Sequence, residues 1–532
     1  MITVKKFYNL AKKDLFPLCR SITGKGTLKT LNIIKENFNE LKIKNIKSGT
    51  KVFDWKIPNQ WEVKDAHLSD KYGKRIIDFK NNNLHLVGYS NPFKKKIVLK
   101  KLLKHLHSIP KQPNAIPYVT AYYKKYWGFC LTHNQKKKIL KNYKYNDKFI
   151  VNINSSLNQN GKLNYGELVI KGKSKQEILI STYVCHPSMA NNELSGPIVA
   201  MSLIEFFKKR KNQKTLRFLF IPETIGSIAY LSRNLNYLKN NLCGGYVLTC
   251  IGDDRQHSCM LSKYGNSLSD KSLLESYKLN KIKFKKYSFL HRGSDERQYN
   301  SPGVDLPISS IFRTKYGEYP EYHTSLDNFK KVVSLKGLNG GFKVARDAIN
   351  ILQKKKIPKN LILCEPSLSK RKLYPAISKK NNKDLRLGQE ILDFLQYADG
   401  KNDLNDIKKG EKISFLYGFL FHEGDAESAG IAGFYGRYPR IPYGRPTAYT
   451  DHNREMFEKC YPFARKLEKE FARMLPKRHL EQKKFADRLD NRFLIGEDTT
   501  FTTITVNSTS ADRNARMACH KDAGSLNAGF SN

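Results

Sequence analysis

The sequence predicts an α/β fold in which helices cover both faces of a largely parallel sheet. Two patterns predict this class. Between residues 177 and 251, short apolar runs alternate with longer amphipathic stretches, which is the succession of strands and helices that a covered parallel sheet requires. Residues 52–152 instead hold Tyr-, Ile- and Val-rich runs separated by Asn, Pro and Gly, which indicates a β-rich insert. At ~100–200 residues per domain, the 532 residues are expected to form several folded units.

The predicted elements begin with a helix and lead to the first strand of the sheet. Apolar residues recur at helical spacing over 27–45, which predicts an amphipathic helix. After the insert, residues 177–184 form a continuous apolar run and predict a buried strand. Ser195 is predicted to cap the next helix, and Pro197 suits its first turn because a proline lacks the N–H that is unpaired there.

The alternation of strands and helices continues along the chain. Residues 215–222 predict a strand, residues 226–240 a helix and residues 245–251 a third strand. Much later, residues 387–397 predict a helix and residues 403–409 a second helical fragment, which together resemble the start of a helix-turn-helix unit.

The basic residues change character near residue 410. The first 410 residues hold 64 Lys and 12 Arg, whereas the last 122 hold 8 Lys and 11 Arg. A bias of this size over a whole segment indicates two stretches of different origin, so we predict a junction there. The predicted domains are an α/β domain over 1–50 and 150–360, the β-rich insert over 51–149, a partial winged helix over 361–410 and a C-terminal segment over 411–532.

Composition also limits the partners and the compartment. The net charge of +47 favours anionic partners such as nucleic acid, but the lysines are scattered in short runs, and solvated surface is the preferred interpretation. Nine cysteines without a Cys-x-x-Cys pair predict reduced thiols in the cytoplasm. The N-terminus does not look like a signal peptide and no run of about 18 apolar residues occurs, so membrane insertion is not expected. The sequence predicts no particular oligomeric state.

Polar side chains follow the ends of four predicted strands. His186, Glu223, Asp253 and His323 each come directly after an apolar strand or shortly beyond it. In open α/β sheets the ligand crevice lies at the carboxyl ends of the strands. Two histidines and carboxylates meeting there match the ligands of zinc, with a spare carboxylate as general base. A core histidine and helix-capping carboxylates are the alternative interpretation of each residue taken singly.

Several words of the sequence resemble the zinc aminopeptidase superfamily. They are NNELSG at 191–196, PETIG at 222–226 and HTSLD at 323–327. More closely, residues 5–410 resemble a bacterial family of aminopeptidase-like proteins, often encoded among polysaccharide biosynthesis genes, with a strand-rich insert and a C-terminal winged helix. The words typical of it are CRSITGKGT, CHPSMANNELSGP, RTKYGEYPEYHTSLDN and CEPSLSKRKLYP. The resemblance implies a zinc-exopeptidase-like mixed sheet with helices on both faces.

The resemblance also implies roles for the strand-end residues. It makes His186, Asp253 and His323 zinc ligands and Glu223 the general base. Asn192 stands where the superfamily has the carboxylate that bridges two metals, with Glu193 beside it as a substitute donor. A second superfamily Glu is replaced at Thr224. The resemblance therefore leads us to expect a single zinc ion, or no metal in a vestigial site.

Further residues are expected to contact the substrate, a small peptide or an acyl amide. Asp295, Glu296 and Arg297 carry charges that could bind a free amine or carboxylate, and Tyr322 stands next to His323. Surface ion pairs are the alternative for these charged residues.

The last 120 residues resemble a different family. The words IPYGRPTA at 441–448, FTTITVN at 501–507 and ACHKDAG at 518–524 are similar to the front half of an iron and 2-oxoglutarate dioxygenase of the TET/JBP kind. His520 and Asp522 would then be two of three iron ligands in a partial double-stranded β-helix. The third ligand would lie downstream, so this segment is expected to be inactive.

Three functions remain as alternatives. The first is a zinc-dependent aminopeptidase-like amide hydrolase in polysaccharide biosynthesis. The second is a catalytically silent protein that binds a peptide or glycan on the peptidase fold, as Asn192 and Thr224 suggest. The third is a DNA-modifying dioxygenase, as His520 and Asp522 suggest.

Overall fold

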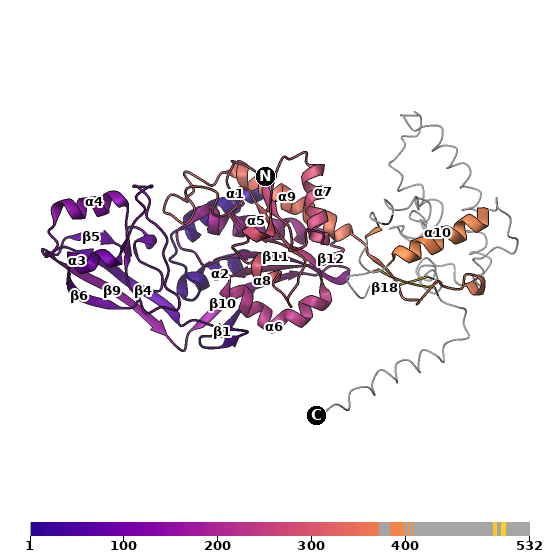
Figure 1. Cartoon of the computed structure of the whole chain (residues 1–532), viewed down its shortest axis with the longest axis horizontal. Helices are drawn as coiled ribbons and strands as arrows, with labels where there is room; N and C mark the ends of the chain where they lie inside the picture. Colours follow the sequence, from indigo (N-terminus) through magenta and orange to yellow (C-terminus); the bar gives the residue numbers. More distant parts are fainter. Residues whose placement is uncertain are drawn as a thin grey trace, which may run out of the picture. The chain divides into compact units, whose positions relative to one another are not determined.

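The computed structural model describes residues 2–371, 383–398, 403, 404, 407, 493–496 and 502–506. The chain divides into two compact units, Met1–Lys354 and Lys355–Asn532. The predicted α/β class is confirmed in the first unit, where helices flank a large mixed sheet (Figure 1). In the described residues, no helix is both long and apolar enough to cross a bilayer.

An eight-stranded sheet forms the centre of the first unit. Its spatial order is β1-β10-β12-β11-β13-β16-β14-β15. The middle strands β12, β11, β13 and β16 run parallel, while β1, β10 and β14 join antiparallel. The strand bounds are β1 Lys42–Lys47, β10 Lys162–Ile170, β11 Ser174–Tyr183, β12 Lys214–Ile221, β13 Leu242–Leu248, β14 Ser258–Met260, β15 Lys285–Tyr287 and β16 Ile308–Phe312. Central parallel strands are covered on both faces, which explains their uninterrupted apolar runs.

Helices cover the two faces of this sheet. Helices α1, α5, α7 and α9 pack against one another over one face, and α2 and α6 lie over the other (Figure 1). The helix bounds are α1 Ile2–Leu10, α2 Lys25–Asn37, α5 Ser195–Lys208, α6 Ile225–Asn241, α7 Leu268–Leu279, α8 Glu296–Tyr299 and α9 Leu335–Lys354. The structure also has two π-helical turns: η1 Ala11–Leu15 precedes Arg20, and η4 Ala190–Leu194 contains Asn192 and Glu193.

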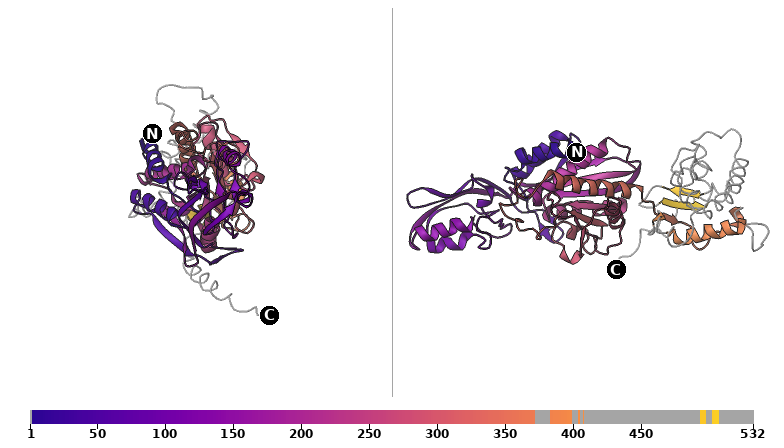
Figure 2. Two further views of the ribbon diagram at one scale, coloured as in Figure 1. Left: turned by 90° about the vertical axis from the view of Figure 1, so that its left-hand side faces the viewer. Right: turned by 90° about the horizontal axis from the view of Figure 1, so that it is seen from above.

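The insert has a sheet of its own and leads away from the central sheet (Figure 2). Strands β5-β4-β9-β6 pair antiparallel in that order, and a capping box of Thr132 and Gln135 begins helix α4. The insert elements are β2 Lys51–Val52, β3 Trp55–Lys56, β4 Gln60–Ser69, β5 Arg75–Asp78, η2 Asn83–His85, β6 Phe93–Val98, α3 Leu99–Leu102, η3 Leu103–His105, β7 Leu106–His107, β8 Phe129–Cys130, α4 His133–Asn142 and β9 Lys148–Asn158.

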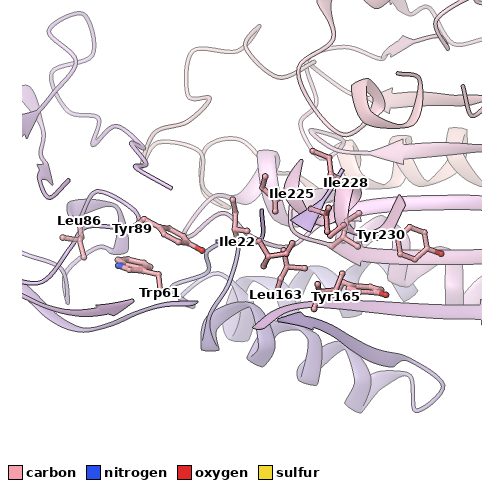
Figure 3. Close-up of a cluster of buried hydrophobic side chains, with 14 of the residues drawn as sticks. Ile22, Trp61, Leu86, Tyr89, Leu163, Tyr165, Ile225, Ile228 and Tyr230 are labelled. Atoms are coloured by element: carbon pink, nitrogen blue, oxygen red, sulfur yellow. The ribbon is translucent and has the colours of Figure 1, made fainter. Parts of the chain in front are cut away.

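One hydrophobic cluster joins the insert to the central sheet. Figure 3 shows Trp61 and Tyr89 of the insert on one side of Ile22, and Leu163 of β10 on its other side. The Trp61 and Tyr89 rings stack with their centroids 5.7 Å apart. Because the buried side chains form one continuous core, the insert is anchored against the central sheet. Residues of the insert can therefore lie at the carboxyl edge of that sheet.

The second unit contains a helix and a small sheet in its described residues. Helix α10 spans Lys383–Tyr397, and strands β17 Pro358–Asn360, β19 Thr502–Val506 and β18 Phe493–Gly496 pair in that order. A short turn, η6, covers Ser369–Arg371. The predicted helix over 387–397 lies within α10. His520 and Asp522 lie outside the described residues, so the incomplete iron site remains a prediction.

Two local expectations are wrong. The helix expected over 27–45 ends at Asn37, and residues 42–47 form edge strand β1 because they pair with β10. Ser195 does not cap α5, since the π-helical turn η4 leads directly into that helix. Its hydroxyl instead donates to the Asn191 carbonyl and accepts from the Ile251 N–H. Ser195 therefore ties the turn to the end of β13.

Candidate functional site

His186 follows β11 and is held on two sides. Its Nδ1 lies 2.6 Å from Oε2 of Glu193, which the π-helical turn η4 places beneath it. The fully buried guanidinium of Arg20 donates to the His186 carbonyl at 2.9 Å and lies 3.8 Å from the Glu193 carboxylate. Burial lowers the pKa of His186, but the neighbouring Cys185 and Glu193 outweigh this and raise it well above its usual value. The ring is thus fixed, with Nε2 directed into the crevice.

Glu223 lies across the crevice from this ring. Its Oε2 is 3.4 Å from Nε2 of His186, and its Oε1 accepts a hydrogen bond of 2.6 Å from the Ser294 hydroxyl. Burial raises the pKa of the Glu223 carboxyl, and the His186 ring lowers it by less. A carboxylate with a raised pKa is better suited to accept a proton near neutral pH.

The backbone after Glu223 is strained. Thr224 has φ 62° and ψ −73°, and the Ile225 N–H donates to the Glu223 carbonyl at 2.7 Å. This is a γ-turn of the rare kind with a positive φ, a conformation that surrounding contacts must enforce. Two contacts hold Thr224 in this conformation. Its N–H donates to Asp295 at 2.7 Å, and its hydroxyl accepts from Arg297 at 2.7 Å.

Asp295 and Glu296 do not reach the crevice as substrate contacts. Both are buried. Oδ1 of Asp295 accepts from the Thr224 N–H and the Ser227 hydroxyl, so it positions the turn after Glu223. Burial, assisted by Glu223, raises the pKa of Asp295 to about 8. The Glu296 carboxylate accepts from backbone N–H groups 293 and 294 and from the Tyr316 hydroxyl. The structure corrects the predicted substrate role of these two residues, because both are buried and, among the described residues, every carboxylate oxygen of the pair except Oδ2 of Asp295 accepts a hydrogen bond from the chain.

His323 faces His186 from the opposite side of the crevice. The two ring centroids are 5.5 Å apart, and Tyr322 stacks on His323 with centroids 3.9 Å apart. Burial and the nearby His186 lower the pKa of His323 to about 3. Within the described residues its buried Nε2 has no hydrogen-bond partner. The ring therefore stays neutral and keeps a lone pair free.

The insert contributes a residue that sequence reasoning missed. The Tyr118 ring packs edge-on against His186 and His323, with centroids at 5.3 and 5.2 Å. Its N–H donates to the His323 carbonyl at 2.9 Å, and Ile116 and Ser325 exchange two further hydrogen bonds nearby. These bonds hold His323 at its positive φ of 55°. No motif marks Tyr118. Arg20, also missed, stands in the recognised word CRSITGKGT.

Asp253 is engaged by donors on both carboxylate oxygens. Oδ1 accepts from the Thr314 hydroxyl at 2.7 Å and the Arg255 N–H at 3.0 Å. Oδ2 accepts from the Thr314 N–H at 2.8 Å and the Asn191 amide at 3.2 Å. A carboxylate has about four lone-pair positions, so all of those of Asp253 are occupied.

The turn that carries Asn192 is held by another carboxylate. Asp327 accepts from the N–H groups of Asn191 and Asn192 at 2.7 and 2.9 Å, and from the Tyr319 hydroxyl at 3.0 Å. Burial raises the pKa of Asp327 to about 6 in spite of these bonds. The side-chain oxygen of Asn192 accepts from the Tyr183 hydroxyl at 3.1 Å. The side-chain oxygen of Asn192 therefore already accepts a hydrogen bond from within the protein, as the oxygens of Asp253 do.

Comparison with known proteins identifies the family. Residues 8–355 match the family model described as a domain of unknown function, DUF4910. The chain belongs to this family. Residues 356–417 match a winged helix-turn-helix model, which confirms the expected winged helix.

A named protein and a crystal structure, both from Clostridium acetobutylicum, are similar to this DUF4910 chain. One is named as a candidate polysaccharide biosynthesis protein with an aminopeptidase-like domain, and it is 41% identical over 412 residues, 77% of this chain and 92% of the relative. A crystal structure of a chain named as a candidate peptidase is 40% identical, with a TM-score of 0.64 over 77% of this chain and 92% of that one. The zinc aminopeptidase BSAP of Bacillus subtilis is 12% identical, with a TM-score of 0.49 over 65% and 93% of the two chains. The aminopeptidase-like fold of the DUF4910 chain follows from the first two.

The free lone pairs of the DUF4910 site decide how a zinc ion fits it. Zinc binds nitrogen and oxygen ligands at about 2.0–2.2 Å. His186 suits it because a histidine that ligates zinc donates its other ring N–H to a carboxylate, here Glu193. His323 suits it through its unpartnered Nε2. Asp253 joins only if one of its four donors is displaced. Nε2 of His186, once it has lost its proton, and Nε2 of His323 are thus the two donors of this site that suit zinc, whereas zinc sites in proteins have three or four protein ligands.

A second group of donors lies next to His186. Cys185, His186 and Glu193 offer three atoms within 4.8 Å of one another. Nδ1 of His186 and Oε2 of Glu193 are only 2.6 Å apart, however, whereas two ligands of a tetrahedral zinc ion are separated by roughly 3.3 Å. Burial raises the pKa of the Cys185 thiol to about 11. This group is a hydrogen-bonded support for the imidazole and not a metal cage.

Proposed function

We propose that the chain hydrolyses the amide bond of a small peptide or acyl amide, with Glu223 as general base. One observation carries the proposal. The Glu223 carboxylate faces an imidazole at 3.4 Å at the carboxyl edge of the sheet, and its side chain keeps 21% of its surface exposed, so water can reach it. A partly exposed carboxylate with a pKa raised by burial has the access and the basicity that a general base requires.

Three residues have separate roles in the proposed hydrolysis. Glu223 takes a proton from water as the water oxygen bonds to the amide carbon, and it returns that proton to the amine when the carbon–nitrogen bond breaks. Ser294 fixes the carboxylate through Oε1 and leaves Oε2 for the water. The clamp on the strained turn at Thr224 keeps Glu223 from rotating away.

The two imidazoles define where the substrate carbonyl would lie. Nε2 of His186 and Nε2 of His323 are the donors to which we assign a single zinc ion, with Asp253 as a third ligand once it is released from a donor. Such an ion would supply a Lewis acid that polarises the carbonyl. The name of one relative, the 41% identical Clostridium acetobutylicum protein, supports a role of this hydrolase in polysaccharide biosynthesis.

The test compares Glu223→Gln with a matched carboxylate variant. Glu205→Gln serves as the control, because Glu205 pairs with Lys6 and Lys209 at the surface of α5. On a panel of N-terminal peptides and acyl amides, with zinc added, Glu223→Gln should lower turnover by about 10² to 10⁴. Glu205→Gln should leave it unchanged. Equal turnover in the two variants would refute the role of Glu223.

A second candidate is a catalytically silent protein that binds a peptide or glycan. Asp253 and Asn192 stand at positions of predicted metal ligands, but their side-chain oxygens already accept hydrogen bonds from the chain. Because these oxygens are not free to bind a metal ion, the contacts favour this second candidate. Wild-type protein that contains zinc, binds members of the panel by calorimetry and releases no product would establish this function instead.

A further inference from the structure

A small cavity lies next to His186, between the N-terminal segment and the insert. Pro187, which follows His186, forms one wall, and the side chains that matter here are Trp61, Leu86, Tyr89, Tyr118, Thr120 and Tyr122. Aromatic and aliphatic groups of the insert share this lining with Asn83 and with Cys19, the buried Arg20 and Ser21 of the N-terminal segment. Two of the residues that line it, Tyr118 and Tyr122, are partly exposed, and the Tyr118 ring also contacts His186 and His323.

The cavity is small and its walls cannot easily retreat. Its volume is about 10 Å³, the lower limit for a single group the size of a water molecule. Gly88 lines it, and a Cβ placed there would already lie 3.2 Å from Cγ2 of Thr120. Trp61 is fixed by its stack on Tyr89 and by a hydrogen bond of 3.0 Å to the Ser90 carbonyl. A chain of several carbons would therefore collide with fixed atoms.

Two tyrosine hydroxyls form a hydrogen-bonded pair in the wall of this cavity. The hydroxyls of Tyr118 and Tyr122 are 2.9 Å apart, so one donates to the other. The hydroxyl that accepts keeps its own proton, and in the described part of the chain neither has a further hydrogen-bond partner. A phenol is protonated at neutral pH, so both hydroxyls are donors as well as acceptors. One O–H is thus free for an oxygen of a ligand.

We propose that this cavity is the acyl subsite of the enzyme, that it takes the methyl of an N-acetyl group, and that the free tyrosine hydroxyl donates to the acetyl carbonyl. The inference rests on the proposed hydrolase function and names its substrate class as N-acetyl amides. Glu223 would then deprotonate the water that bonds to the acetyl carbon. The carbon–nitrogen bond breaks, the proton passes from Glu223 to the nitrogen, and the products are acetate and a free amine.

Two sources offer this chemistry, an N-acetylated amino sugar and an N-acetylated peptide terminus. The acyl subsite recognises only the acetyl end that they share. The experiment therefore uses the N-acetyl, N-propionyl and N-butyryl derivatives of both glucosamine and alanine. Binding is measured by calorimetry with Glu223→Gln as background, so that it does not depend on turnover. Hydrolysis of the same six compounds is measured with the wild type.

The length series gives the main result. One extra methylene against a closed apolar pocket costs ~10–200-fold in selectivity. Affinity should therefore fall at least tenfold from acetyl to propionyl and again to butyryl, in whichever of the two series binds. Butyryl compounds that bind or react as well as acetyl compounds would overturn the assignment, and so would the failure of all six to bind.

Thr120 offers a variant that fills the cavity and a control that does not. Thr120→Leu adds bulk beside Gly88 and should abolish binding of the acetyl compounds, whereas Thr120→Val keeps the shape and should preserve it. Unchanged affinity in Thr120→Leu would overturn the proposal. Should acetyl compounds bind with the predicted length dependence while the wild type releases no acetate, the subsite stands and the hydrolase function fails. Should the wild type hydrolyse acetyl, propionyl and butyryl compounds equally well, the hydrolase function stands and the acyl subsite fails.

Discussion

Removal of the Arg20 charge should destabilise the first unit more than the loss of any exposed ion pair. Arg20 and Glu193 both have fully buried side chains, and Nε of Arg20 lies 3.8 Å from the Glu193 carboxylate. Arg20 also donates to the carbonyls of Leu15 and His186. Arg20→Met keeps much of the volume of the side chain but leaves Glu193 without this countercharge and two carbonyls without a donor.

The expected magnitude follows from that burial. Breaking a buried ion pair by removing one partner costs about 3–5 kcal/mol, because the remaining charge stays desolvated. Arg75→Met is the matched control, since Arg75 pairs with Asp78 while 41% of its side chain is exposed. Exposed pairs of this kind contribute about 0–1 kcal/mol. In the double variant Arg20→Met/Glu193→Gln the unpaired charge is gone, so part of the loss should be recovered.

Urea unfolding followed by tryptophan fluorescence measures these free energies. The three tryptophans of the chain, Trp55, Trp61 and Trp127, all lie in the first unit, so the signal reports that unit alone. A loss for Arg20→Met no larger than that of Arg75→Met would refute the reasoning. The reasoning would also be refuted if the double variant Arg20→Met/Glu193→Gln lost as much free energy of unfolding as the two single variants lose together, or more.

Two further predictions concern the metal and the buried acid. Asn192→Asp adds an anionic oxygen near the imidazoles, so zinc affinity in competition with a chromophoric chelator should rise at least tenfold, and an unchanged affinity would contradict the assigned site. Asp295 has its folded-state pKa raised to about 8 from the ordinary 3.8, so the folded chain holds a proton that the unfolded chain releases between these values. The stability contributed by this group is therefore greatest below pH 4 and is lost as the pH rises to 8. Asp295→Asn should gain stability relative to the wild type across that window, by up to about 1.4 kcal/mol per pH unit in urea unfolding, and a gap that does not change with pH would contradict the cause.

Much of the fold could be predicted because its signals are local. The apolar run over 177–184 gave β11, and the run over 215–222 gave β12, since parallel strands covered on both faces need continuous apolar residues. The helix expected over 27–45 was only partly right. Residues 42–47 carry no strong strand pattern, and they become β1 because β10 offers an unpaired edge to them.

The sequence by itself determined where His186 and Glu223 stand, because each follows closely on a strand that its own neighbours specify, whereas His323 lies well beyond the end of β16 at Phe312 and is held by the insert. Only the tertiary structure decided which of their lone pairs remain free. Asp253 is occupied by Thr314 and Asn191, each more than 60 positions away along the chain. Hydrogen bonds and close packing reach only a few ångströms, so such partners depend on how distant segments meet. For the same reason, no local pattern could show that the buried charge of Arg20 would lie beneath His186.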